Sequence, residues 1–319
     1  MADFTSNLHI IYTDESINFS PPNCNSYSMS SIIASYNDYV DKIEPNWNKL
    51  RSKYSIPDGV CLHFTDIKAL LNPRYFTRKI EDRNPSMENI FCTNDQLDQT
   101  LLHNFYNDVL NFIKTNEFVV VTSNLTEPKS QKFDSYIQKN HVNSTWYILF
   151  KKHLDDLAEY ALREKYLISR PKGKPLKTAL NFKGKIRYDG DYNLSNKNDI
   201  RDAFSHSITT GTTRFNSSII RNCFDELRFI NKAEVGFCSN CSSLPSCSNR
   251  NFSHAGNEIV DFIAAYAGKF LVKTDYIKYL KLSYPSENVE ASYKKATTLF
   301  VDNKVIEPIN TISNKIYTP

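Results

Sequence analysis

Hydrophobic residues in this chain follow two periods that alternate along the sequence. Short runs rich in β-branched and aromatic residues predict strands at 8–13, 27–36, 118–122 and 185–189. Longer segments with apolar residues at helical spacing predict helices at about 97–113, 145–166 and 257–272. Strands that alternate with long helices are typical of an α/β fold, which is the fold class that we expect.

The predicted elements are interrupted twice. The segment from 37 to 95 is irregular and carries four prolines, so we expect loops and short helices that form an insertion. A second insertion is predicted at about 163–185, where prolines and a glycine break the chain. The 319 residues allow one elaborated domain or two small ones. We expect a single domain over 1–275, followed by a C-terminal extension at 276–319.

Composition argues against several classes of function. Only 8 glycines occur and neither common Gly-rich phosphate motif is present, which argues against a nucleotide-binding loop. The formal net charge of +4 is too small to indicate a nucleic-acid or membrane partner by itself. The longest apolar stretch, at 262–272, is too short to span a bilayer. Residues 1–10 lack the features of a secretory signal, and seven cysteines is an odd number. We therefore expect a cytoplasmic protein with reduced thiols or a metal site.

Acidic residues stand where predicted elements begin or end. Asp14 follows the first strand, and Asp189 ends the strand at 185–189. Glu258 and Asp261 are three residues apart at the start of the last predicted helix, so both project from one side of it. Carboxylates that converge from such positions would form a cation-binding centre. Alternatively, each acid is independently a cap or turn residue, because the helix dipole favours acids in a first turn.

Basic residues are concentrated just before Asp189. Between Arg163 and Arg187, nine basic residues accompany a single acid. A cationic arm of this kind is suited to hold a phosphate backbone, and a solvated loop is the alternative. The candidate nucleic-acid-binding residues are Arg170, Lys172, Lys174, Lys177, Lys183, Lys185 and Arg187.

Two further groups of polar residues have the spacing of a ligand set. One offers four candidate zinc ligands within 17 residues, with free surface thiols as the alternative. Its members are Cys238, Cys241, Cys247 and His254. The other group lies opposite the apolar stripe of the helix at 145–166, so we expect it to form a solvated face. Its members are Asp155, Asp156 and Glu159.

Four short motifs stand in order along residues 8–270. They are IYTDES at 11–16, LHFTDI at 62–67, RYD at 187–189 and GNEIVDFIA at 256–264. Together they resemble a bacterial family, domain-of-unknown-function family 3800. In that family the corresponding motifs are a "DES" opening, an "H-x-x-D/E-L/I" segment, an internal strand that ends in Asp and a closing "G-x-Q-x-A-D-x-I-A" helix.

The resemblance implies a ribonuclease-H-like fold, which is a mixed sheet flanked by helices, here with insertions. It also implies metal-dependent nuclease activity, connected in some members with mobile elements or phage defence. By position, the acidic centre would be Asp14, Asp189 and Asp261, holding Mg²⁺ or Mn²⁺. The chain departs from the family pattern where Cys61 replaces a frequent Glu and Glu258 replaces the Gln. Either Glu258 or Asp66 then provides a fourth acid, or the site is weakened.

The residue types suit the implied reaction. Phosphodiester hydrolysis needs an activated water and stabilisation of charge on the phosphate oxygens, which a pair of divalent cations on oxygen ligands supplies. His63 is a candidate proton carrier, although a lone histidine is more often a surface or packed residue. We expect a nuclease that acts on RNA or DNA. One alternative is a non-catalytic nucleic-acid-binding or sensing protein, and another is an interaction or inhibitory module whose acids are structural caps.

Overall fold

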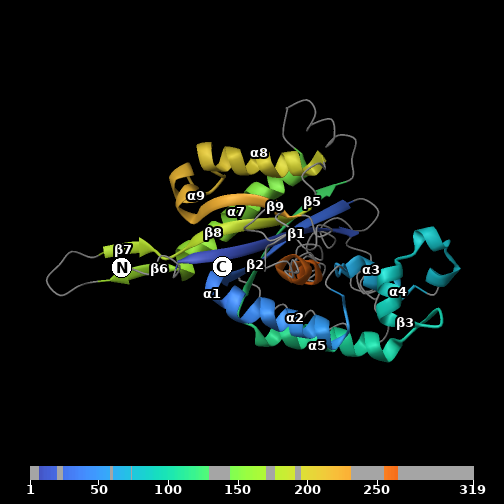
Figure 1. The fold of residues 1–319 in the computed structure, drawn as a ribbon. Helices are drawn as coiled ribbons and strands as arrows, with labels where there is room; N and C mark the ends of the chain where they lie inside the picture. Colours follow the sequence, from blue (N-terminus) through green and yellow to red (C-terminus); the bar gives the residue numbers. More distant parts are fainter. Residues whose placement is uncertain are drawn as a thin grey trace, which may run out of the picture.

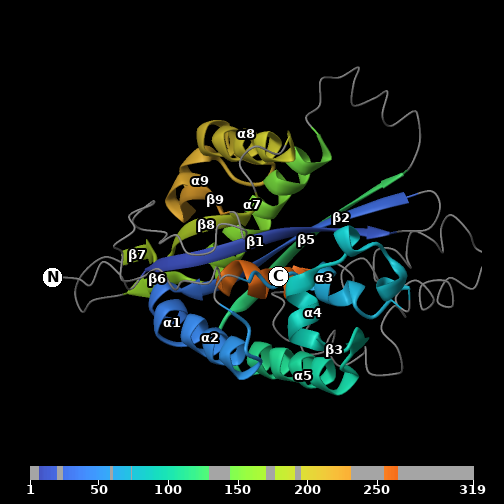
Figure 2. The ribbon, with the colours of Figure 1, turned by 45° about the vertical axis from the view of Figure 1, so that its right-hand side comes forward.

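A mixed five-stranded sheet forms the centre of the protein (Figures 1 and 2). The computed structural model describes residues 7–19, 24–57, 60–72, 74–128, 144–169, 177–190, 195–230 and 255–264. The strands of the sheet, in spatial order, are β5 (Val119–Pro128), β2 (Cys24–Ser35), β1 (Leu8–Phe19), β8 (Lys183–Asp189) and β9 (Phe224–Ile230). Because helices cover both of its faces, the expected α/β class is confirmed.

The first strand lies in the middle of the sheet and separates two kinds of pairing. On one side, β1 pairs antiparallel with β2, and β2 pairs antiparallel with β5. On the other side, β8 runs parallel to β1, and β9 runs parallel to β8. The carboxyl ends of β1, β8 and β9 therefore lie at the same edge of the sheet.

Alternating side chains of β1 divide the core into two layers. Tyr12 belongs to the cluster on one face, whereas Ile11 belongs to the cluster on the other. The first face carries α1 (Tyr36–Asp38), η1 (Tyr39–Ile43), α2 (Glu44–Lys53), α5 (Gln99–Thr115) and the helix of residues 255–264, drawn in orange in Figure 1. The second face carries α7 (Thr145–Glu164), α8 (Ser195–Thr210) and α9 (Ser217–Cys223).

The irregular segment at 37–95 contains short helices, as expected, and they pack into the core. After α2 come α3 (Phe64–Ala69), η2 (Tyr75–Thr77), η3 (Ile80–Asp82), α4 (Pro85–Phe91), β3 (Cys92–Thr93) and β4 (Gln96–Leu97). Phe91 of this segment is fully buried against Phe105 of α5, and Trp47 is fully buried against Phe112 of α5. The segment thus supplies much of the first layer of the core.

The second predicted interruption contains a two-stranded hairpin. It consists of β6 (Tyr166–Ser169) and β7 (Lys177–Leu180), which pair antiparallel and project from the body of the molecule (Figures 1 and 2). The hairpin leads into the beginning of β8 at Lys183, which pairs with Leu8 at the beginning of β1. None of the described helices combines the length and the apolar character that crossing a membrane requires.

Candidate functional site

Asp14 and Asp189 lie where the parallel pairing between β1 and β8 ends. Asp189 ends β8, whereas the prediction that Asp14 follows the first strand is wrong, because β1 continues to Phe19 and stays paired with β2. β1 pairs with β8 so that Thr13 is opposite Tyr188, and the next residue of each strand is an aspartate. Residues opposite each other in a parallel pair point to the same face, and neighbouring strands lie about 4.8 Å apart. Both carboxylates therefore leave the sheet side by side on the first face. Asp14 is buried, and its Oδ1 accepts a 2.8 Å hydrogen bond from the Glu15 backbone N–H.

The helix of residues 255–264 lies along β1 on the same face. Gly256 sits against the ring of Tyr12 so closely that an added Cβ would be 2.1 Å from a ring carbon. At the other end of the helix, the hydroxyl of Ser16 donates to the Ala264 carbonyl at 3.3 Å. Since Tyr12, Asp14 and Ser16 share a face of the strand, the helix covers the face from which Asp14 projects.

Asn257 connects this helix to Asp189. Its Nδ2 lies 3.3 Å from Asp189 Oδ1 and 3.4 Å from the Ile230 carbonyl at the end of β9. Asn257 is fully buried, and its Oδ1 meets no hydrogen-bond donor within the described part of the chain. Nothing in the sequence singles out Asn257 as a site residue, because an asparagine in a first helical turn is normally explained as a cap.

Asp261 stands one turn further along the helix and holds the LHFTDI segment. Its Oδ2 accepts a 2.6 Å hydrogen bond from the Phe64 backbone N–H at the start of α3. His63 lies between two acids, with Nε2 3.7 Å from Asp261 Oδ1 and Nδ1 3.9 Å from Asp66 Oδ1. The side chains of His63 and Asp66 are both about two-fifths exposed, at 41% and 43%. The structure thus brings Asp261, His63 and Asp66 together.

Glu258 points toward α2 and Leu62 and has a structural role. One of its oxygens accepts from Arg51 Nη1 at 2.5 Å and from the Leu62 backbone N–H at 2.8 Å. The other oxygen accepts from Trp47 Nε1 at 2.6 Å, and the residue is 2% exposed. These donors occupy both carboxylate oxygens, so Glu258 does not join Asp14 and Asp189.

The chemistry of the residues at this edge fits a hard divalent cation. Carboxylate and amide oxygens are the donors that Mg²⁺ and Mn²⁺ prefer, and the orphaned Oδ1 of Asn257 is such a donor in a buried position. In the described ranges, no three or more His, Cys, Asp and Glu side chains are already gathered closely enough to hold a metal ion. Neighbouring carboxylates repel one another before a cation binds, which favours a wider spacing.

Among the described basic candidates, Arg187 stands two residues before Asp189, whereas Lys183 lies at the other end of the same strand. Lys183 is at the beginning of β8, and six residues at about 3.3 Å each place it roughly 20 Å from Asp189. The basic residues are close to Asp189 in the sequence, but the extended strand β8 separates the β6–β7 hairpin from Asp189 in space. Lys177 begins β7, its side chain is not described, and the other three candidates of the arm, Arg170, Lys172 and Lys174, fall outside the described residues.

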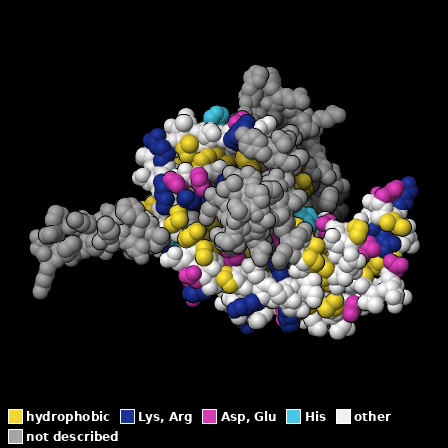
Figure 3. Space-filling view, viewed as in Figure 1, with side chains coloured by type: hydrophobic (Ala, Val, Ile, Leu, Met, Phe, Trp, Pro, Cys, Tyr) yellow, Lys and Arg dark blue, Asp and Glu magenta, His cyan; other side chains and the backbone are white. Residues whose placement is uncertain are grey.

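The three basic candidates on β8 are paired with acids of β9. Lys183 lies 4.0 Å from Asp225, Lys185 lies 4.0 Å from Glu226, and Arg187 lies 2.5 Å from Glu226. Figure 3 shows basic and acidic side chains intermingled on this face of the described surface. The proposed zinc ligands Cys238, Cys241, Cys247 and His254 fall outside the described residues, whereas Cys61, Cys92 and Cys223 are free thiols.

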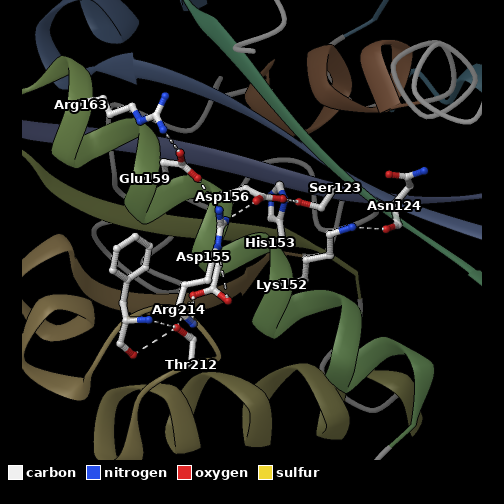
Figure 4. A network of polar contacts seen from close by, with 11 residues as sticks. Ser123, Asn124, Lys152, His153, Asp155, Asp156, Glu159, Arg163, Thr212 and Arg214 are labelled. Carbon is white, nitrogen blue, oxygen red and sulfur yellow. Dashed lines mark hydrogen bonds and ion pairs between the residues drawn. The ribbon is translucent and has the colours of Figure 1, made fainter. Parts of the chain in front are cut away.

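The expectation that the acids of α7 form a solvated face is wrong. Asp155 is only 2% exposed, and Arg214 forms ion pairs with Asp155, Asp156 and Glu159 (Figure 4). The loop before α9 folds back onto α7 and covers these carboxylates, which a helical periodicity cannot reveal. The Thr212 hydroxyl also donates to Asp155.

A buried polar chain passes from the same network to β1. Ser123 donates to Asp156 at 2.5 Å and lies 2.9 Å from His153 Nδ1, while His153 Nε2 lies 2.7 Å from Ser31 Oγ (Figure 4 shows the His153 part). Ser31 in turn lies 2.6 Å from Thr13 Oγ1, next to Asp14. Burial lowers the pKa of His153 to about 3, so the imidazole is neutral.

The contact between Ser31 and His153 resembles a nucleophile with its base, but both side chains are fully buried and no substrate reaches them. The sequence does contain an indication of this buried series of polar contacts. His153 occupies an inner position of the apolar stripe, between Phe150 and Leu154. A polar residue at such a position needs buried partners.

Comparison of the chain with protein-family models, with curated proteins and with solved structures found no match in any of the three. The function of this protein has to be inferred from its own residues.

Proposed function

We propose that this protein is a ribonuclease-H-like nuclease of domain-of-unknown-function family 3800, which hydrolyses phosphodiester bonds of RNA or DNA with Mg²⁺ or Mn²⁺. Asp14, Asp189 and Asp261 would hold the cations. The observation that carries the proposal is the placement of Asp14 and Asp189, level with each other on adjacent parallel strands in the middle of the sheet.

The arrangement of the strands supports the ribonuclease-H-like part of the proposal. The resemblance implies a mixed sheet. Here β1 is central, with β2 antiparallel to β1 and β5 antiparallel to β2 on one side, and with β8 and β9 parallel on the other. Helices on both faces are also consistent with it. The four motifs that resemble the family meet in space, since the helix of residues 255–264 contacts β1, β8 and the LHFTDI segment.

The proposed roles of the side chains follow from their positions. Asp14 and Asp189 offer carboxylate oxygens on neighbouring strands of the sheet, and Asp261 accepts a hydrogen bond from the Phe64 N–H. A bound divalent cation supplies an activated water and neutralises charge that develops on the phosphate. His63 is exposed and lies beside Asp261, where it can pass a proton to or from solvent.

Cleavage of labelled RNA and DNA in the presence of Mn²⁺ tests the proposal. We expect wild-type protein to cut at least one of them, and Asp14→Asn and Asp189→Asn to lose roughly 100-fold or more of the rate. Asp225→Asn is a matched control, since Asp225 lies at the opposite end of the sheet on β9. No cleavage by wild type, or equal cleavage by Asp14→Asn, contradicts the proposal.

A non-catalytic nucleic-acid-binding or sensing protein is the second candidate. The observation that favours it is that Arg51 and Trp47 donate hydrogen bonds to Glu258, so this carboxylate does not join Asp14 and Asp189. Such a protein would bind nucleic acid with a strong dependence on salt and show no metal-dependent turnover. The resemblance would place either function in phage defence or mobile-element biology. The cleavage experiment, run beside a binding measurement at 50 mM and 200 mM salt, separates the two.

A further inference from the structure

The amide of Asn257 has a fixed orientation. Its neighbours at 3.3 and 3.4 Å are the Asp189 carboxylate and the Ile230 carbonyl, both of which only accept hydrogen bonds. The two N–H groups of Nδ2 must therefore face them. The amide oxygen is left on the other side, fully buried, with no donor in the described residues.

A buried amide oxygen without a donor is unfavourable unless a ligand satisfies it. The acidic side chain that contacts Asn257 is Asp189, and it already accepts from the amide nitrogen. A hard cation satisfies an amide oxygen and neighbouring carboxylates together. Asp189 is in direct contact with the same amide, and Asp261 follows four residues later on the same side of the helix.

We propose that Asn257 Oδ1 is an oxygen ligand of the divalent-cation site, in place of the acid that the sequence offers at Glu258. This inference rests on the proposed function, because it assumes that Asp14, Asp189 and Asp261 hold Mg²⁺ or Mn²⁺. Neighbouring helical positions are rotated by about 100°, so Asn257 faces the sheet while Glu258 faces α2 and Arg51. The site then has three carboxylates and one neutral amide.

Calorimetric titration with Mn²⁺ measures the contribution of this oxygen. We expect Asn257→Ala to bind Mn²⁺ roughly 10- to 100-fold more weakly than wild type. Asn116→Ala is the matched control, since Asn116 is also a buried asparagine at a helix end but has its amide oxygen occupied by Asn46. Its affinity for Mn²⁺ should equal that of wild type. Equal affinity in Asn257→Ala overturns the inference.

A change of ligand chemistry separates a ligand from a residue that only supports Asp189. Sulfur favours Cd²⁺ over Mg²⁺, so Asn257→Cys should raise the ratio of Cd²⁺ to Mg²⁺ affinity at least about 10-fold over wild type. Asn116→Cys controls for the added thiol and should leave the ratio unchanged. A residue that acts only through its contact with Asp189 would weaken both cations alike. An unchanged ratio in Asn257→Cys therefore overturns the inference.

An NMR measurement on wild-type protein tests the inference independently, and a variant is used only to assign one signal. In protein labelled with ¹⁵N-asparagine, saturating Mn²⁺ should broaden the side-chain amide signal of Asn257 beyond detection. The Asn257 signal is assigned by its absence in Asn257→Asp. If wild type binds no Mn²⁺, the proposed function fails and the inference with it. If wild type binds Mn²⁺ through Asp14 but the Asn257 signal persists, only the inference is overturned.

Discussion

Glu258 and Asp261 are three residues apart on one helix, and the donors around them give them different roles. Glu258 is enclosed by Arg51, Trp47 and a backbone N–H, whereas Asp261 accepts one short backbone hydrogen bond and lies beside the exposed His63. At the scale of single residues, the surroundings of a carboxylate rather than its spacing decide whether it is available to a ligand.

Removal of Arg51 tests the structural role of Glu258. Arg51→Met leaves the Glu258 carboxylate buried without its cation, and we expect the free energy of unfolding to fall by about 3–5 kcal/mol. In the Arg51→Met, Glu258→Gln double variant the uncompensated charge is gone, so part of this loss should be recovered. Urea unfolding of the wild type, both single variants and the double variant measures the coupling. Additive losses would mean that the pair does not interact as the structure indicates.

At the scale of elements, two contacts hold β1 in place from opposite faces. On the first face the helix of residues 255–264 packs against Tyr12 through Gly256. On the second face Thr13 is tied through Ser31 to His153 on α7. Asp14 follows directly after these two anchored residues, so both faces of the sheet contribute to its position.

The close approach at Gly256 predicts the effect of adding one methyl group. Because the new Cβ would overlap the ring of Tyr12, Gly256→Ala should lower the free energy of unfolding by about 1–3 kcal/mol and weaken Mn²⁺ binding. Tyr12→Leu removes the ring and relieves the overlap. Chemical denaturation should then show a smaller cost of Gly256→Ala in the Tyr12→Leu background. The same cost in both backgrounds would place the helix elsewhere.

The neutral His153 predicts a pH dependence of stability. Its pKa is about 3 in the folded protein and about 6.5 when unfolded, so between these values only the unfolded state takes up the proton. Its contribution to stability is complete above pH 6.5 and declines as the pH falls. From pH 7.5 to 5.0, wild type should lose about 2 kcal/mol more than His153→Gln in urea unfolding. A difference between the two proteins that does not change with pH would show that His153 titrates normally.

At the scale of the whole molecule, local sequence patterns predict several strands and helices, but they do not predict which strands pair. Local β-branched runs predict the strands before Asp14 and Asp189, although β1 continues to Phe19, and apolar stripes predict α5 and α7. Sheet order depends on pairing between segments far apart, such as β1 with β8, which no local pattern encodes. α8, α9 and β9 were not predicted, since α8 is rich in Ser, Asn and Thr and buries few large residues.

The candidate site shows the same division. Its acids were predicted from their places at the ends of elements, but two of its features depend on tertiary contacts. Arg51 bonds Glu258 from a position 207 residues earlier in the sequence. The oxygen of Asn257 is left without a donor because the amide nitrogen is turned toward Asp189. Sequence contiguity predicts the basic arm beside the site; in the described residues Arg187 is two residues from Asp189, whereas the 7-residue β8 places Lys183 at its other end.

An anomalous difference map from a crystal soaked in Mn²⁺ tests the central claim most directly. We expect a Mn²⁺ peak within about 2.0–2.5 Å of carboxylate oxygens of Asp14 and Asp189, with Asp261 turned toward the same ion or a second one about 4 Å away. The peak should be absent from crystals of Asp14→Asn. A map without a peak beside Asp14 and Asp189, in crystals that take up Mn²⁺ elsewhere, would contradict the account.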